Sequence, residues 1–286
     1  MKVDFLRKKY DRELLIDCFE MRENLNVNKS TQPFWVTFYE IIFFTSGFGE
    51  FRIDEEIVSF KKGTVLLLPP NKWRQWLHLS DDTDALFLIF EEEFISRFFN
   101  DALYLYRFAY FYNTDTPSYV NLTDCEMGVM SQKLMEVQQE LKSLKDDSRH
   151  FLRALLYYIL IQLNREYQTA HSISKTFYRE QLVLQFRKLL EKHIIEKQRV
   201  VDYAQLLQVS TSHLNKKLKL FLGKNCSELI KERLLLEIKK QLLFSKKTIS
   251  EISYGLNFSE PSNFNRFFHT MTKMTPKQFR LENDNS

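Results

Sequence analysis

A group of apolar and small residues recurs 49 positions further along the C-terminal part of the chain, and this repeat constrains the fold more than any other feature. The two copies are Val200, Ala204, Leu207, Val209 and Ser210, then Ile249, Ser253, Leu256, Phe258 and Ser259. Each copy predicts a short helix with a small residue where a second helix crosses, a turn with a buried apolar residue, and a serine that caps the next helix. Asn257 lies in the second turn, where we expect a positive φ that asparagine tolerates. Each copy therefore predicts a helix-turn-helix.

The helix after each turn is predicted to have an apolar side and a polar side. The apolar stripe comprises Leu214, Leu218 and Phe221 in residues 211–221, and Phe264 and Phe268, with Phe267 at the margin, in residues 260–271. Polar side chains opposite these stripes can hydrogen-bond to DNA, with asparagine suited to adenine and arginine to guanine. We expect base contacts from Thr211, Ser212, Asn215, Lys216, Ser262, Asn263 and Arg266, and phosphate contacts from Lys219, Lys224 and His269. The alternative is a solvated helix surface, but two such surfaces after matched turns in one basic domain favour DNA contact.

The charge distribution and the connecting segment agree with this interpretation. Residues 175–286 carry 21 Lys and Arg against 11 Asp and Glu, a net charge of +10, whereas residues 1–174 carry −6. A basic domain attracts a polyanion such as DNA, although an anionic membrane surface would attract it too. Residues 226–245 are predicted to form one helix, which would span roughly 30 Å. Successive major grooves on one face of DNA lie roughly 34 Å apart, so this connector would place both predicted helices in adjacent grooves.

The N-terminal part has the pattern of a small β domain. We predict strands over residues 34–44, 49–53, 57–60, 64–68 and 85–90, turns at 45–47, 54–56 and 61–63, and an acidic break at 91–93. Strands this short at this spacing predict an antiparallel barrel or sandwich. The whole chain is therefore expected to be an α+β multidomain protein.

After residue 91 the apolar period becomes helical. Met130, Leu134, Val137, Leu141 and Leu144 are spaced 4-3-4-3, and a second stripe follows a break at 146–148. The pattern predicts a helical hairpin that either packs on the β domain or forms a homodimer contact. The predicted domains are 1–125 (β domain), 126–170 (hairpin), 171–180 (polar linker) and 181–286 (two helix-turn-helix units).

A ligand pocket in the β domain is a further hypothesis, because closed β-structures can enclose small molecules. The candidate lining residues are Phe34, Trp35, Phe38, Phe43, Phe51, Trp73 and Trp76, with Lys72 or Arg74 to bind an anion such as a carboxylate. The alternative is that these aromatic side chains fill the core, since aromatic residues are ordinary strand formers.

Catalytic and metal-binding patterns are absent from the sequence. The six histidines include no pair at i, i+4 and none at ligand spacing from a cysteine, and there is no H-E-x-x-H, P-loop or G-x-S-x-G motif. Cys18, Cys125 and Cys226 are far apart, which is typical of thiols in a reducing cytoplasm. The N-terminus lacks the apolar core of a signal peptide, and the longest apolar stretches are too short to span a bilayer. We expect a cytoplasmic protein that is not an enzyme, needs no metal or cofactor and does not bind a membrane.

Over about 100 residues, the C-terminal sequence resembles the AraC/XylS family of transcription activators. The matching segments are 209–223, Arg233, 242–243, 249–259, 265–268, 274–276 and 279–280. The resemblance implies two helix-turn-helix units joined by a helix, with base contacts from Ser212, Asn215, Lys216, Ser262, Asn263 and Arg266. It also implies double-stranded DNA and RNA polymerase as partners and an activator role. Two residues depart from the family pattern: Asn257 replaces a common glycine, and Lys273 stands where a glycine usually precedes Met-Thr-Pro.

The N-terminal sequence resembles the cupin-like sensor domains of the same family, less specifically. The matching residues are 39–41, 47–49, 53–54, 63–64, 68–69 and Trp76. The resemblance implies a small-molecule effector that modulates a homodimeric regulator. Arg74 stands where relatives often have a histidine, and the His and Glu clusters of metal-binding cupins are absent. The rival hypothesis is a cupin-type ligand-binding or enzymatic protein whose C-terminal helices serve assembly.

Overall fold

The computed structural model describes residues 2–7, 9, 13–24, 32–99, 103–112, 117–171 and 180–284. The chain divides into two compact units, Met1–Tyr178 and Arg179–Ser286. The division falls within the predicted linker over 171–180, of which residues 172–179 lie outside the described residues.

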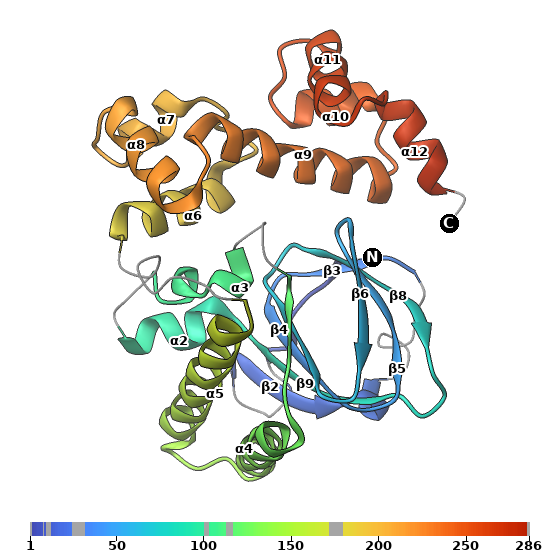
Figure 1. The fold of residues 1–286 in the computed structure, drawn as a ribbon, viewed down its shortest axis with the longest axis vertical. Coiled ribbons are helices and arrows are strands. Elements are labelled where there is room, and N and C mark those ends of the chain that lie inside the picture. Colours follow the sequence, from blue (N-terminus) through green and yellow to red (C-terminus); the bar gives the residue numbers. More distant parts are fainter. Residues whose placement is uncertain are drawn as a thin grey trace. The chain divides into compact units, whose positions relative to one another are not determined.

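The first unit is built on two five-stranded sheets of cupin type (Figure 1). One sheet has the order β1-β3-β8-β5-β6 and the other the order β10-β7-β4-β9-β2; the pairs are antiparallel except β1 with β3. The strands are β1 Lys2–Val3, β2 Ile16–Glu20, β3 Phe34–Val36, β4 Tyr39–Ser46, β5 Phe48–Ile53, β6 Glu56–Lys61, β7 Thr64–Leu68, β8 Trp73–Leu79, β9 Asp84–Phe90 and β10 Tyr119–Asn121. The helical elements are η1 Met21–Asn24, α2 Glu92–Phe99, η2 Leu105–Arg107, α3 Ala109–Tyr112, α4 Asp124–Lys142 and α5 Ser148–His171.

Strand β4 shows why its sheet, with the order β10-β7-β4-β9-β2, is apolar on both faces. Tyr39, Ile41 and Phe43 belong to a core shared with α4 and α5, whereas Ile42 and Phe44 belong to the core between the two sheets. Side chains of a strand alternate between its faces, so covering both faces buries a continuous apolar run.

Several predicted strands are confirmed, and two predictions are corrected. Strands over 49–53, 57–60, 64–68 and 85–90 match β5, β6, β7 and β9. The single strand predicted over 34–44 is wrong: the chain breaks at 37–38, and β3 and β4 enter different sheets. The acidic segment 91–93 is not only a break, since Glu92 and Glu93 form the first turn of α2, where the helix dipole favours negative charge.

The helical hairpin is confirmed as α4 and α5, and it packs on the sheet. Met130, Leu134, Val137 and Leu141 are buried in one core with residues of β2, β4 and β9, and Leu144 is partly buried against it. The predicted stripe therefore serves packing within this unit.

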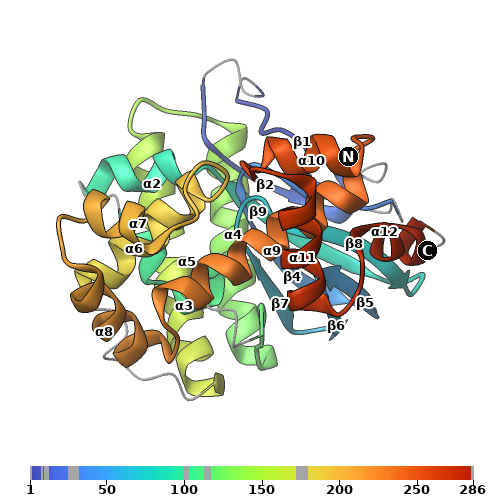
Figure 2. The same ribbon diagram turned by 90° about the horizontal axis from the view of Figure 1, so that it is seen from above.

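The second unit is helical and is organised around one long helix (Figures 1 and 2). Its helices are α6 Gln181–His193, α7 Val200–Leu206, α8 Thr211–Leu222, α9 Cys226–Phe244, α10 Ile249–Gly255, α11 Pro261–Thr272 and α12 Pro276–Asp284. Ile230, Leu234, Ile238 and Leu242 of α9 are buried in a core that takes residues from both copies of the repeat. The two helix pairs, α7–α8 and α10–α11, are thus joined by a packed α9.

None of the described helices combines the length and the hydropathy that a membrane span requires.

Candidate DNA-binding surface

The turns of the two helix pairs have the same backbone geometry. Gln208 and Asn257 have φ angles of 55° and 60°, so the predicted positive φ at Asn257 is confirmed. The amide after each turn bonds five residues back, from Val209 N to Ala204 O at 3.0 Å and from Phe258 N to Ser253 O at 3.1 Å. Ala204 and Ser253 are both buried, as expected for small residues at a close helix crossing. The sequence repeat is therefore also a repeat of local structure.

The second helix of each pair begins differently. Ser210 is the N-cap of α8, and its Oγ accepts a hydrogen bond from the His213 amide at 3.1 Å. The prediction that Ser259 caps the second helix is wrong, because Glu260 is the N-cap residue and Pro261 occupies the first turn of α11. Proline is suited to the start of a helix because its missing N–H removes one donor that would lack a partner.

The apolar stripes of α8 and α11 are buried as predicted. Leu214, Leu218, Phe264 and Phe268 are each 0% exposed. Phe221 and Phe267 lie partly buried at the edge of the same core. Both helices are therefore anchored on one side, and the opposite side is left to solvent.

The polar side of α8 carries most of the residues predicted for the first unit. Thr211, Ser212, Lys216 and Lys219 are exposed. Asn215 is half-buried, and its Oδ1 accepts a hydrogen bond from the backbone N–H of Cys226 at 2.9 Å, at the start of α9. Its amide oxygen therefore has a structural role that the sequence pattern did not reveal.

Lys224 lies beyond the end of α8, and its Nζ is 3.2 Å from a carboxylate oxygen of Glu232. Lys224 thus forms an ion pair within the second unit and is less exposed than Lys216 and Lys219 of α8.

The polar side of α11 carries the residues predicted for the second unit. Ser262, Arg266 and His269 are exposed, and Asn263 is half-buried. Asn263 Nδ2 donates to Ser259 Oγ at 2.9 Å, and Arg266 Nη2 donates to Asn263 Oδ1 at 2.7 Å. Two of the predicted residues, Asn263 and Arg266, are therefore connected to each other and to Ser259, which precedes α11.

Helix α9 and a second, smaller contact hold the two helix pairs together. The 19 residues of α9 correspond to roughly 28 Å along its axis. In addition, Gln198, which lies before α7, donates its side-chain amide to Leu256 O, and Asn257 Nδ2 donates to Glu196 O at 3.4 Å. The asparagine thus makes a contact that the more common glycine would lack, and no local sequence pattern indicates this contact.

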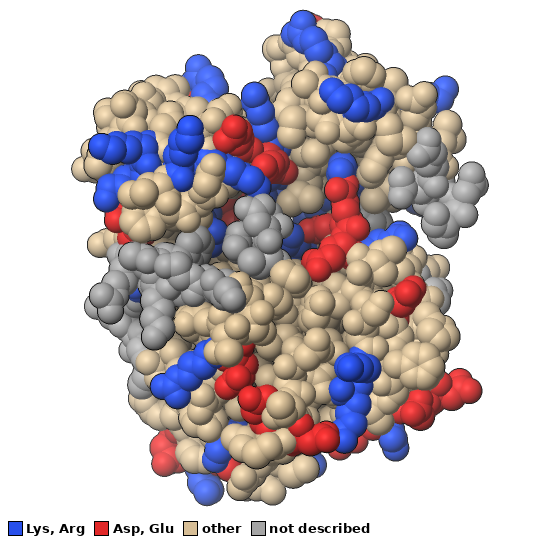
Figure 3. Space-filling model, in the orientation of Figure 1, with Lys and Arg blue, Asp and Glu red and all other residues tan. Residues whose placement is uncertain are grey.

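Positive charge is prominent on the second unit. In the view of Figure 3, Lys and Arg side chains lie over the region of α7 and α8. Lys216 and Lys219 of α8 belong to the exposed basic residues of this unit. A basic surface with exposed hydrogen-bonding side chains has the chemistry needed for contact with nucleic acid.

The predicted effector-site residues of the first unit do not share one compartment. Phe38, Phe51 and Trp76 lie between the two sheets, but Phe43 lies in the core on the helical side of β4. Phe43 therefore does not share a compartment with the other three, because adjacent residues of a strand face opposite sides of the sheet. Trp73 is buried as well.

Both predicted anion-binding cations have carboxylate partners. Lys72 Nζ lies 2.6 Å from Asp54 Oδ2. Arg74 is buried, and its Nη1 lies 2.5 Å from Glu40 Oε2 while its Nη2 donates to Pro69 O at 2.8 Å. Burial raises the pKa of the Glu40 carboxyl and lowers the pKa of the Arg74 guanidinium, and each charge opposes the effect on the other. Both cations therefore already have an anionic partner within the first unit.

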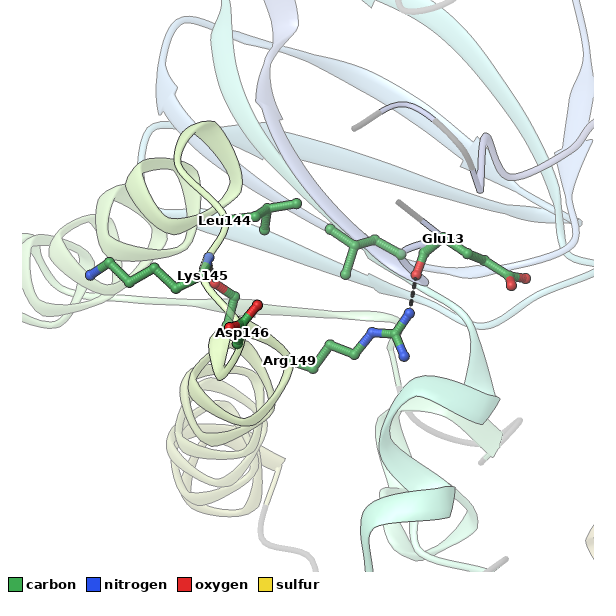
Figure 4. Close-up of a pocket in the computed structure, with 7 residues that line it drawn as sticks. Glu13, Leu144, Lys145, Asp146 and Arg149 are labelled. Atoms are coloured by element: carbon green, nitrogen blue, oxygen red, sulfur yellow. Dashed lines mark hydrogen bonds between the residues drawn. The ribbon is translucent and has the colours of Figure 1, made fainter. Parts of the chain in front are cut away.

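A pocket of about 420 Å³ lies elsewhere in the first unit (Figure 4). Its lining residues are Glu13, Leu14, Leu144, Lys145, Asp146, Ser148 and Arg149. Arg149 Nη2 donates to the backbone oxygen of Glu13 at 2.8 Å and links the start of α5 to the segment before β2. No residue of this pocket was among the predicted effector contacts. Among the described residues, no cluster of His, Cys, Asp and Glu is suited to a metal ion.

Comparison with known proteins gives two family matches along the chain. Residues 22–160 match the AraC-like ligand binding domain, and residues 203–282 match a helix-turn-helix domain. Uncharacterized HTH-type transcriptional regulators of Staphylococcus aureus strains MSSA476 and MRSA252 are 24% and 25% identical over 202 and 168 residues, or 71% and 57% of this chain. These residues are 26% and 22% of the relatives' lengths, so the chain spans about a quarter of the curated proteins it matches.

Solved structures with detectable likeness include ToxT from Vibrio cholerae, with 14% identity, a TM-score of 0.43 and coverage of 93% of this chain and 97% of that one. An AraC-type DNA-binding domain from Chromobacterium violaceum is 24% identical, with a TM-score of 0.33 and coverage of 36% and 91%.

The chain thus combines an AraC-like ligand-binding domain in its first unit with paired helix-turn-helix units in its second. The chain belongs to the AraC/XylS family.

Proposed function

We propose that the protein is a sequence-specific, cytoplasmic transcription activator that inserts α8 and α11 into adjacent major grooves of DNA. The observation that carries this proposal is the pairing of two helices with the same anchoring, each buried along one stripe and polar on the other side. The length of α9 supports the same arrangement, since roughly 28 Å approaches the spacing of roughly 34 Å between successive grooves.

Base contacts are proposed from Thr211, Ser212, Asn215, Lys216, Ser262 and Arg266, and phosphate contacts from Lys219, Lys224 and His269. Asn263, which the sequence also assigned to a base, is proposed to act through Arg266. The exposed members of this set support the proposal most strongly. To contact DNA, Asn215 would have to share or give up its bond with the Cys226 amide. Lys224 would likewise have to share or give up its ion pair with Glu232.

Selection of bound sequences from a random DNA pool by the full chain tests this function directly. We expect an asymmetric motif with two conserved segments about one helical turn apart. Recovery of no motif would indicate a nonspecific DNA-binding protein instead. The same selection in increasing salt should show a steep loss of affinity, because phosphate contacts release condensed counterions.

We further propose that a small molecule bound by the first unit modulates DNA binding. The AraC-like match supports a ligand in this unit. We place the site between the sheets, near Phe38, Phe51 and Trp76, rather than at Phe43. Crosslinking of a photoreactive ligand to residues of α4 instead would contradict this placement.

A homodimer remains part of the proposal, but not through the stripe of Met130, which is buried within the unit. We place the contact on the outward side of α4, where Val129 and Met135 are 39% and 54% exposed. Light scattering on the full chain should show a dimer that Met135→Lys weakens. RNA polymerase is the proposed partner in activation, on the basis of the family.

A further inference from the structure

The side chains of Ser259, Asn263 and Arg266 form a hydrogen-bonded chain along the exposed side of α11. Asn263 bridges the other two, with Nδ2 2.9 Å from Ser259 Oγ and Oδ1 2.7 Å from Arg266 Nη2. The three residues are spaced at i, i+4 and i+7, which places them on one side of a helix and of the residues that lead into it.

The direction of each bond in this chain is set by chemistry. An arginine has only donors, so Arg266 requires the amide oxygen of Asn263. The amide nitrogen of Asn263 then faces Ser259, whose hydroxyl oxygen can accept. Ser259 is available for this contact because Glu260, and not Ser259, is the N-cap residue of α11.

This arrangement engages both ends of the Asn263 amide, each through one of its two hydrogen-bonding sites, so Ser259 and Arg266 fix how the amide is turned. Bidentate recognition of adenine by asparagine needs the amide oxygen and the amide nitrogen together. Arg266, in contrast, has five N–H groups and donates one of them to Asn263. It keeps enough donors for the two hydrogen bonds that an arginine makes to guanine O6 and N7.

We propose that Asn263 is a positioning residue that holds Arg266 for the recognition of a guanine and does not itself read a base. The inference rests on the proposed function and assigns the specificity of α11 to Arg266. A long arginine side chain loses rotamer freedom when it binds, and a contact that restrains it beforehand reduces this loss on DNA.

The first helix pair lacks this combination at the matching positions. Counted from the first residue of each helix, Asn263 corresponds to His213 and Arg266 to Lys216. Lys216 has a compact ammonium group that cannot make the planar two-pronged contact of arginine. We therefore expect a stronger base preference at the base pairs that α11 contacts than at those that α8 contacts.

The test is selection of bound DNA by the full chain, followed by affinity measurements on single-base variants of the selected site. The proteins are the wild type, Asn263→Ala, Arg266→Ala, the double variant and Asn263→Asp. Thr270→Ala is the matched control, since Thr270 is an exposed polar residue of the same helix whose hydroxyl donates to the backbone oxygen of Arg266 and not to its side chain. Circular dichroism confirms that each variant is folded.

We expect Arg266→Ala to abolish the preference for guanine at one base pair and Asn263→Ala to weaken the preference at that same base pair by about 3- to 10-fold. The double variant should lose no more preference than Arg266→Ala alone, because coupled residues are not additive. Asn263→Asp keeps an acceptor for Arg266, so it should retain the guanine preference although its charge lowers affinity for all sequences. Thr270→Ala should select the wild-type motif.

The proposal is overturned if Asn263→Ala relaxes a different base pair from Arg266→Ala, which would make Asn263 a base reader. It is also overturned if Asn263→Ala leaves the guanine preference unchanged. Failure of the wild type to select any motif would instead refute the proposed function, so the two failures are distinguishable.

Discussion

The two helix-turn-helix units share a plan but reach it with different residues. The first crosses its helices at Ala204, caps α8 with Ser210 and ends it at Gly223, with a φ of 71°. The second crosses at Ser253 and ends α11 at Lys273, with a φ of 63°. A glycine adopts this left-handed conformation at little cost, whereas a lysine pays a steric penalty. The buried stripe and the turn therefore define the unit, whereas the residues at the ends of its second helix can differ.

The largest expected effect is a loss of stability when a buried residue of the apolar stripe of α8 or α11 is removed. Phe268→Ala removes a fully buried ring from the core and should lower the free energy of unfolding by about 3–5 kcal/mol. Leu218→Ala, the matched change in α8, should lower it by about 2–5 kcal/mol. Chemical denaturation of the full chain measures both. Loss of under 1 kcal/mol in either variant would mean that its helix is not anchored as described.

The next effect separates base contacts from phosphate contacts. Arg266→Ala should reduce the free energy of binding to the selected site by roughly 1–3 kcal/mol and relax the preference at one base pair. Lys219→Ala should weaken binding to all DNA sequences similarly and reduce the slope of log affinity against log salt concentration by about 1. Fluorescence anisotropy at several salt concentrations distinguishes the two. If Arg266→Ala lowered the affinity for every DNA sequence equally, Arg266 would be a phosphate contact.

A smaller effect concerns the helix ends. Lys273→Gly should raise stability by about 0.5–1 kcal/mol, because glycine removes the steric penalty of the positive φ. Gly223→Ala should destabilise the first unit by a similar amount, about 1 kcal/mol. Both values come from thermal or denaturant unfolding. A destabilising Lys273→Gly would show that the lysine side chain contributes more than its backbone conformation costs.

The smallest effect is expected at the helix crossings. The Ser253 hydroxyl is buried and has no hydrogen-bond partner within the described part of the chain, and its counterpart is Ala204. Ser253→Ala should therefore be neutral or stabilise by up to about 1 kcal/mol, while Ala204→Ser should destabilise by about 1–3 kcal/mol. A clear loss of stability in Ser253→Ala would reveal a hydrogen bond of that hydroxyl.

Features that depend on local periodicity were predictable from the sequence. The stripes of Leu214 and Phe264, the turn at Asn257 and strand β7 over residues 64–68 follow from apolar spacing and turn residues, and the structure confirms them. Strand β8 was missed because Arg74, Gln75 and His78 interrupt the apolar pattern, although Arg74 is buried by its pairing with Glu40.

Features that depend on distant partners were not predictable. Asn215 was assigned to DNA by its place on α8, but its contact with Cys226 arises only when α9 packs beside that helix. Phe43 and Phe51 look alike in the sequence, and only the arrangement of the two sheets shows that they face different cores. The bridge from Ser259 to Arg266 required the position of the first residue of α11, which the sequence placed differently.

The central claim is that α8 and α11 occupy adjacent major grooves on one face of DNA. Dimethyl sulfate protection of guanines in the selected site, with the full chain bound, tests it most directly. We expect two protected major-groove segments whose centres are about 10 base pairs apart. A single protected segment, or two segments on opposite faces about half a turn apart, would contradict it.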